Sequence, residues 1–172
     1  MAILPIRIYP DPVLRVRCPE VEKFDTELKI LAQNMIETMH SAPGIGLAAP
    51  QVGVETRLAV VDITAGESED AIHIFVNPEI VNPTGKETDE EGCLSIPGIT
   101  EKVSRAVALK VHALDLDGNP FETEADGLFA RAICHEVDHL DGVLFVDRLV
   151  GLRKERVKRQ LKRMGHRQEA RT

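Results

Sequence analysis

The chain has 172 residues, of which 43% are hydrophobic and 28% charged, as in an ordinary soluble globular protein, and we predict one domain over residues 1–172. Its net charge is −7, and its scarcity of aromatic residues (3%, with no Trp) argues against stacking platforms for bases, so no DNA partner is expected. No apolar run approaches the roughly 20 residues that cross a bilayer, and no secretion signal is evident, so we expect no membrane partner and a cytoplasmic location.

The first predicted element is an amphipathic helix between Asp25 and Ser41. Asp25 is a suitable N-cap, and the segment 41–44, which contains Pro and Gly, ends the helix. Apolar residues recur at intervals of three and four, as a buried helix face requires: Phe24, Leu28, Leu31, Met35 and Met39. The two methionines are therefore expected in the core rather than on a metal.

Short strands are predicted in the middle of the chain. Residues 57–63 and 72–76 are apolar and β-branched, and the polar stretch 64–70 between them has the composition of a surface loop. Apolar residues alternate over residues 107–113, which predicts a third strand that ends at the turn 117–120. Residues 121–123 are a candidate hairpin partner for this strand.

Two further helices are predicted near the C-terminus, from about Glu124 to Leu140 and from about Leu152 to Met164. Gly142 lies just beyond the first of them, where a left-handed cap is expected. The strands do not alternate regularly with helices, which favours the α+β class. We predict small antiparallel or mixed sheets around a central helix, plus the N-terminal amphipathic helix and a C-terminal helix.

The central helix contains the sequence His135-Glu136-Val137-Asp138-His139. Positions i and i+4 of a helix share one face, so both imidazoles can bind one metal ion. Glu136 is placed to carry the proton of a water molecule rather than to bind the metal. Such a segment can also be a solvated surface, but the apolar residues around it indicate a buried helix, on which unpaired His and Glu are costly. The central helix is therefore predicted to bear a metal.

A hydrolytic metal site needs a third protein ligand and one open position. Downstream, only Glu155 and His166 are candidates, and both lie in the basic C-terminal helix. Cys93, in the turn-like segment 91–95, is a better ligand because a cation holds its thiol deprotonated. One Cys and two His leave a position open, as in catalytic sites. The ligand types by themselves favour zinc.

A third segment, residues 44–51, contains two glycines but lacks the residues of a phosphate-binding loop. One interpretation is a loop that ends the preceding helix. The other is a close approach of the backbone to a substrate, with the Gln51 amide donating a hydrogen bond to an oxyanion.

Together and in this order, segments 44–51, 91–95 and 135–139 resemble the three signature motifs of the peptide deformylase family. The resemblance extends over nearly the whole chain. It implies an enzyme of the bacterial cytosol that hydrolyses the formyl group from N-formylmethionine at the start of nascent polypeptides and releases formate. The implied cofactor is one divalent metal ion, Fe²⁺ by preference, with Zn²⁺, Ni²⁺ and Co²⁺ as alternatives.

The resemblance also implies roles for individual residues. Glu136 would be the general acid and base, and Gln51 and the backbone N–H of Leu94 would form the oxyanion hole. The implied metal ligands are Cys93, His135 and His139. The implied substrate-binding residues, which form the methionine pocket or pair with the peptide backbone, are Ile45, Gly46, Gly92, Leu128, Ala132 and Ile133. Arg131 stands where the family often has an apolar residue, which implies a more polar rim of the pocket.

The C-terminal segment differs in charge from the rest of the chain. Residues 153–172 contain nine Lys and Arg against two Asp and Glu, whereas the body is acidic. A solvated amphipathic helix would account for this composition. The alternative is a weak, salt-sensitive contact with the phosphates of ribosomal RNA.

Two other functions are compatible with parts of the pattern. A zinc endopeptidase would share the helix motif, but the Cys93 ligand and the lack of a good downstream ligand argue against it. A non-catalytic metal-binding or RNA-binding module is the second alternative. Glu136 argues against that module, because a closed structural site has no use for a carboxylate placed to transfer protons.

Overall fold

The computed structural model describes residues 1–171 and contains seven strands and three α-helices within that range. The helices are α1 (Thr26–Ser41), α2 (Gly127–Leu140) and α3 (Gly151–Glu169). The strands are β1 (Gly46–Ala48), β2 (Leu58–Val61), β3 (His73–Thr84), β4 (Glu87–Cys93), β5 (Ile96–Arg105), β6 (Ala108–Leu114) and β7 (Pro120–Asp126). Short 3-10 helices are η1 (Pro12–Arg15), η2 (Ala49–Val52), η3 (Glu69–Ala71) and η4 (Phe145–Arg148).

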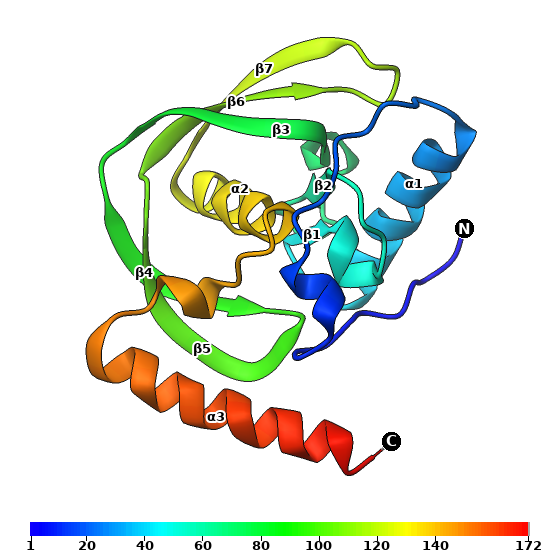
Figure 1. Cartoon of the computed structure of the whole chain (residues 1–172). Coiled ribbons are helices and arrows are strands. Elements are labelled where there is room, and N and C mark those ends of the chain that lie inside the picture. Colours follow the sequence, from blue (N-terminus) through cyan, green and yellow to red (C-terminus); the bar gives the residue numbers. More distant parts are fainter. Residues whose placement is uncertain (172) are drawn as a thin grey trace.

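The strands form two antiparallel sheets around α2. One sheet has five strands in the order β1-β2-β3-β6-β7, and the other is the two-stranded hairpin β4-β5. Figure 1 shows α2 at the centre, with β3 and β6 passing over one side of it and β4 and β5 over the other. This arrangement confirms the predicted α+β class with a central helix.

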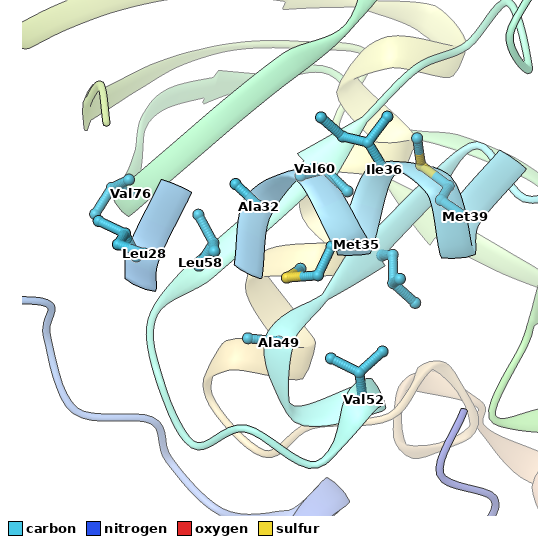
Figure 2. Packing of buried hydrophobic residues seen from close by; sticks show 11 residues of the cluster. Leu28, Ala32, Met35, Ile36, Met39, Ala49, Val52, Leu58, Val60 and Val76 are labelled. Atoms are coloured by element: carbon cyan, nitrogen blue, oxygen red, sulfur yellow. The ribbon is translucent and has the colours of Figure 1, made fainter. Parts of the chain in front are cut away.

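Strand β2 lies between α1 and α2, and its side chains point alternately to one helix and to the other. Leu58 and Val60 belong to the cluster that packs against α1, and Figure 2 shows them facing the apolar side of that helix. Val61 belongs instead to the cluster around α2, and Ala59 belongs to a small cluster that includes Leu140 at the end of α2. All four β2 residues are buried.

Helix α1 confirms the prediction from its periodicity. The Asp25 side chain accepts a hydrogen bond from the backbone N–H of Leu28 at 3.0 Å and caps the helix. Met35 and Met39 are fully buried in the core, as expected of apolar filler.

Several elements differ from the predictions. The hairpin β4-β5 was not predicted, because most of the β4 residues are exposed and four of the seven are acidic. Strand β3 continues beyond residue 76 through two prolines. Asn77 and Asn82, each preceding a proline, have φ of 51° and 49°, and the register with β6 shifts at both places. These bulges let the strand pass residues that would interrupt a regular ladder.

The two C-terminal helices also differ from the predicted bounds. Helix α2 begins at Gly127 rather than at about residue 124, because residues 124–126 pair with β6 as the end of β7. Helix α3 is longer than predicted and contributes Val157 and Leu161 to a cluster with β5 and η4. None of the helices within residues 1–171 combines the length and apolar composition that a bilayer span requires.

Candidate metal centre and cleft

Three side chains with metal-binding atoms converge at the centre of the molecule. His135 and His139 lie one turn apart on α2, and Cys93 ends strand β4. Cys93 Sγ is 3.3 Å from His139 Nε2, and that nitrogen is 3.2 Å from His135 Nε2. The ligand atoms of the three residues all lie within 4.8 Å of one another. One ion can therefore contact all three.

The chemistry of this set fits a divalent metal ion with an open position. Burial holds the pKa of His139 well below its usual range, which favours the neutral imidazole that binds metals. Beside the ligands, Glu136 Oε2 is buried without a hydrogen-bond partner within the described residues. A buried carboxylate oxygen without a donor is costly, so this atom fits a site that receives a water molecule or a substrate N–H.

Glu136 is also electrostatically suited to exchange a proton. Burial and the negative charge of Glu91 raise the pKa of Glu136 to about 7, although the neighbouring His135 acts to lower it. A carboxyl group with such a pKa can accept and return a proton near neutral pH.

A second layer of charged residues supports the ligands. Glu91 Oε2 accepts a hydrogen bond from His135 Nδ1 at 2.8 Å, which directs the other ring nitrogen toward Cys93 and His139. Burial by itself would raise the pKa of Glu91, but hydrogen bonds from His135 and Arg105 outweigh it and lower the pKa to about 2. Arg105 also binds Asp138 of α2 at 2.6 Å. The carboxylate that orients His135 is therefore ionised.

The Gln51 amide is held in one orientation at the edge of the metal centre. Its Oε1 accepts a hydrogen bond from the Ala48 N–H at 2.9 Å. Its Nε2 donates to Ser95 Oγ at 3.2 Å and points toward Cys93 Sγ at 3.7 Å. Because the oxygen is engaged by the backbone, the NH₂ group faces the site and can serve as a donor there. Leu94 follows Cys93 in the hairpin turn.

A cleft of about 370 Å³ opens over the metal centre. One wall is the segment 43–46, which includes the start of β1, and the other is the segment 90–94 at the end of β4. Helix α2 forms the floor with Leu128, Arg131, Ala132, His135 and Glu136. Each wall includes the edge of a strand, because within the described residues β1 pairs only with β2 and β4 only with β5. Free strand edges on two sides are suited to an extended peptide.

Most of the predicted site residues line this cleft, namely Ile45, Gly46, Gln51, Gly92, Cys93, Leu94, Leu128, Ala132, His135 and Glu136. Ile133, which was predicted to bind the substrate, lies elsewhere. It is 1% exposed and packs in the core cluster with Phe75 and Val111, not in the cleft. One helical step of about 100° from Ala132 turns it away from the face of α2 that lines the cleft. The expected loop 44–51 contains β1 and η2, so it is more regular than a loop.

Sequence reasoning did not predict the environment of Arg131. This residue lines the cleft, yet it is only 7% exposed, because its guanidinium points to Glu91 and to backbone carbonyls rather than to a polar rim. A signal was present in its position, since Arg131 precedes His135 by four residues and therefore shares its helix face.

Comparisons with known proteins identify the family of this chain. Residues 3–155 match the model of the polypeptide deformylase family. A peptide deformylase of Chromobacterium violaceum is 52% identical over 95% of this chain and 96% of its own length, and that of Acidobacterium capsulatum is 47% identical over similar shares, 95% and 96%. The crystal structure of a peptide deformylase from Legionella pneumophila superimposes with a TM-score of 0.88 at 45% identity, covering 99% of both chains. The chain therefore belongs to the peptide deformylase family.

Proposed function

We propose that this protein is a metal-dependent hydrolase that removes the N-formyl group from the N-terminal formylmethionine of newly synthesised polypeptides and releases formate. The observation that carries the proposal is Glu136 Oε2, which is buried at the cleft without a hydrogen-bond partner in the described part of the chain, beside three side chains whose metal-binding atoms converge. Membership of the peptide deformylase family supports the choice of a formyl amide as the bond that is cleaved.

The metal would be held by Cys93, His135 and His139. We propose Fe²⁺ as the ion in the cell, with Zn²⁺, Ni²⁺ or Co²⁺ able to replace it, since thiolate and imidazole ligands accept each of these ions. When bound, the ion supplies Lewis acidity, which lowers the pKa of a water molecule and polarises the formyl oxygen.

The chain's own residues supply the proton transfer and the donors for the transition state. Glu136 accepts a proton from the attacking water and returns it to the leaving amine, as its pKa near neutrality permits. The Gln51 NH₂ group and the Leu94 N–H donate hydrogen bonds to the oxygen on which negative charge develops. Donors already in position cost no reorganisation during the reaction.

The substrate would lie as an extended strand between β1 and β4. Its backbone would pair with Gly46 and Gly92 at the two free edges, and its methionine side chain would enter the apolar part of the cleft formed by Ile45, Leu128 and Ala132. A formyl carbon bears only hydrogen, so close walls around the metal would admit it and exclude an acetyl group.

The basic helix α3 supports a second proposal, namely contact with the ribosome in the bacterial cytosol. Its Lys and Arg side chains are exposed while Val157 and Leu161 hold the helix to the body. Replacing Lys154, Arg159, Lys162 and Arg163 by Gln should weaken salt-sensitive co-sedimentation with ribosomes and leave catalysis intact. Unchanged co-sedimentation would contradict the proposal.

The activity is tested by formate release from N-formyl-Met-Ala-Ser, with N-acetyl-Met-Ala-Ser as the control substrate and protein purified anaerobically with Fe²⁺. We expect formate from the first peptide and no hydrolysis of the second. Glu136→Gln, which keeps the shape of the side chain, should retain the metal and lose at least about 100-fold in kcat. No formate from the metal-loaded protein would refute the proposal, and cleavage inside an unformylated peptide would favour an endopeptidase.

A further inference from the structure

The metal centre is divided between two units of the fold. His135 and His139 lie on α2, whereas Cys93 ends β4 in the two-stranded hairpin β4-β5. Figure 1 shows α2 and this hairpin as separate elements. A two-stranded hairpin is marginally stable by itself, so its position depends on what it packs against. The distance between the cysteine and the histidines is therefore determined by the contacts that hold the hairpin on α2.

Arg131 is the α2 residue that reaches both strands of the hairpin. Its Nη1 donates to the Val103 carbonyl of β5 at 2.8 Å, and its Nη2 donates to the Glu87 carbonyl of β4 at 2.9 Å. Nη1 also contacts Glu91 Oε1 at 3.1 Å. One guanidinium thus connects the helix to β4 through a carbonyl and a carboxylate, and to β5 through a carbonyl.

The same contacts complete the hydrogen bonding of Glu91. Its Oε1 accepts from Arg131 and from Arg105 Nε at 3.0 Å, and its Oε2 accepts from Arg105 Nη2 at 2.8 Å and from His135 Nδ1 at 2.8 Å. A carboxylate has about four acceptor positions, and all four are in use. Glu91 therefore has one orientation, and through it the His135 ring has one orientation as well.

We propose that Arg131 is a positioning residue that clamps the β4-β5 hairpin to α2 and so sets the geometry of the Cys93, His135 and His139 site. The inference rests on the metal site of the proposed function. Arg131 touches neither the metal ligands' coordinating atoms nor the reacting atoms in the contacts described, and it acts through the hairpin and Glu91.

The clamp requires an arginine. The planar guanidinium presents donors in fixed directions to three acceptors, whereas a lysine ammonium is a compact group on a flexible stem. Arg131→Lys retains the charge but lacks the planar fork, and Arg131→Met retains much of the aliphatic packing but none of the hydrogen bonds. The two variants form a graded series.

Arg57 provides a matched control. Its guanidinium also binds α2, through the Leu140 carbonyl at 3.2 Å and Asp141 at 2.7 Å, and its side chain is 12% exposed against 9% for Arg131. These contacts lie at the C-terminal end of α2 and do not involve the hairpin. Arg57→Met removes a comparable arginine without altering the connection between the two halves of the metal site.

The experiment measures the rate at which Co²⁺-loaded protein loses its metal to excess chelator, followed by the Co²⁺–thiolate absorption band. We expect Arg131→Met to release Co²⁺ about tenfold faster than wild type, since supporting partners of metal ligands typically change affinity by 10–100-fold. Arg131→Lys should be intermediate, and Arg57→Met should stay within about twofold. If Arg131→Met does not fold, Arg131→Lys carries the test.

Two results would overturn the inference. One is a release rate equal to wild type in a folded Arg131 variant, and the other is equal acceleration by Arg57→Met, which would indicate a general loss of stability. A wild-type protein without the Co²⁺–thiolate band would instead refute the metal site, and the inference with it. An intact band with unchanged release in the variants would refute the inference alone.

Discussion

The carboxylate of Glu136 occupies the space beside Gly46 that a side chain at position 46 would fill. A Cβ atom on Gly46 would lie 2.9 Å from Cδ of Glu136 and even closer to its Oε1. Gly46 begins the edge strand β1, and Glu136 rises from α2, so the two elements approach as closely as backbone and carboxylate permit. The absence of a side chain at Gly46 therefore determines where the proposed general base points.

The first prediction follows from this approach. Gly46→Ala should lower kcat for the formylated peptide by about 100-fold, because the methyl group displaces the Glu136 carboxylate from the ligands. Metal content should not change, since no ligand is altered. Steady-state kinetics and metal analysis check this outcome. Gly165→Ala in α3 is the control, since the nearest atom to its Cβ is 4.0 Å away, and it should retain full activity. Wild-type kcat in Gly46→Ala would contradict the prediction.

The second prediction concerns the metal ligands. Cys93→Ala removes the only sulfur among the three convergent side chains, so the protein should be largely metal-free after dialysis. Cys134→Ala should keep its metal, because Cys134 packs against the apolar cluster beneath α2 and burial raises the pKa of its thiol. Elemental analysis of both proteins decides the matter. Full metal content in Cys93→Ala would exclude its thiolate as a ligand.

The third prediction concerns stability in acid. Burial would raise the pKa of Asp62, but hydrogen bonds from Thr64, His40 and Gly66 outweigh it and lower the pKa from 3.8 to about 2. A pKa that is lower in the folded state stabilises the protein above the unfolded-state value, and this contribution disappears as the pH falls from about 4 to about 2.

Asp62→Asn should therefore be less stable than wild type at pH 7, and the difference should shrink over that acidic range. Urea unfolding at several pH values measures it. The control is Asp70→Asn, since Asp70 is exposed. A constant difference from pH 7 to pH 2 would show that the lowered pKa of Asp62 does not contribute.

The fourth prediction concerns the core between β2 and α1. Leu58 is fully buried in the cluster shown in Figure 2, so Leu58→Ala should lower the free energy of unfolding by about 2–5 kcal/mol. Leu58→Met, which conserves volume, should cost less than about 1.5 kcal/mol. Ile30→Ala, at a side chain that is 54% exposed, should change stability little. Equal losses in the two Leu58 variants would contradict this account.

Local patterns were sufficient to predict several elements. The spacing of Leu28, Met35 and Met39, together with the Asp25 cap, specifies α1 because a helix repeats every 3.6 residues and its cap bonds lie within one turn. Alternation over residues 107–113 likewise matches β6. In contrast, β4 could not be predicted from apolar alternation, since its exposed acidic residues are held by pairing with β5 rather than by burial of a hydrophobic face.

The sequence by itself determined which residue types are available for a metal site, and it placed the two histidines on one helix face. The i, i+4 spacing of His135 and His139 is sufficient for that, because helical geometry is local. The sequence also indicated Cys93 as the third ligand, but only the tertiary structure brings it to His139 across 46 residues and joins the hairpin to α2 through Arg131. Such contacts depend on how separate elements pack, and spacing along the chain does not specify the distance between elements that are far apart in sequence.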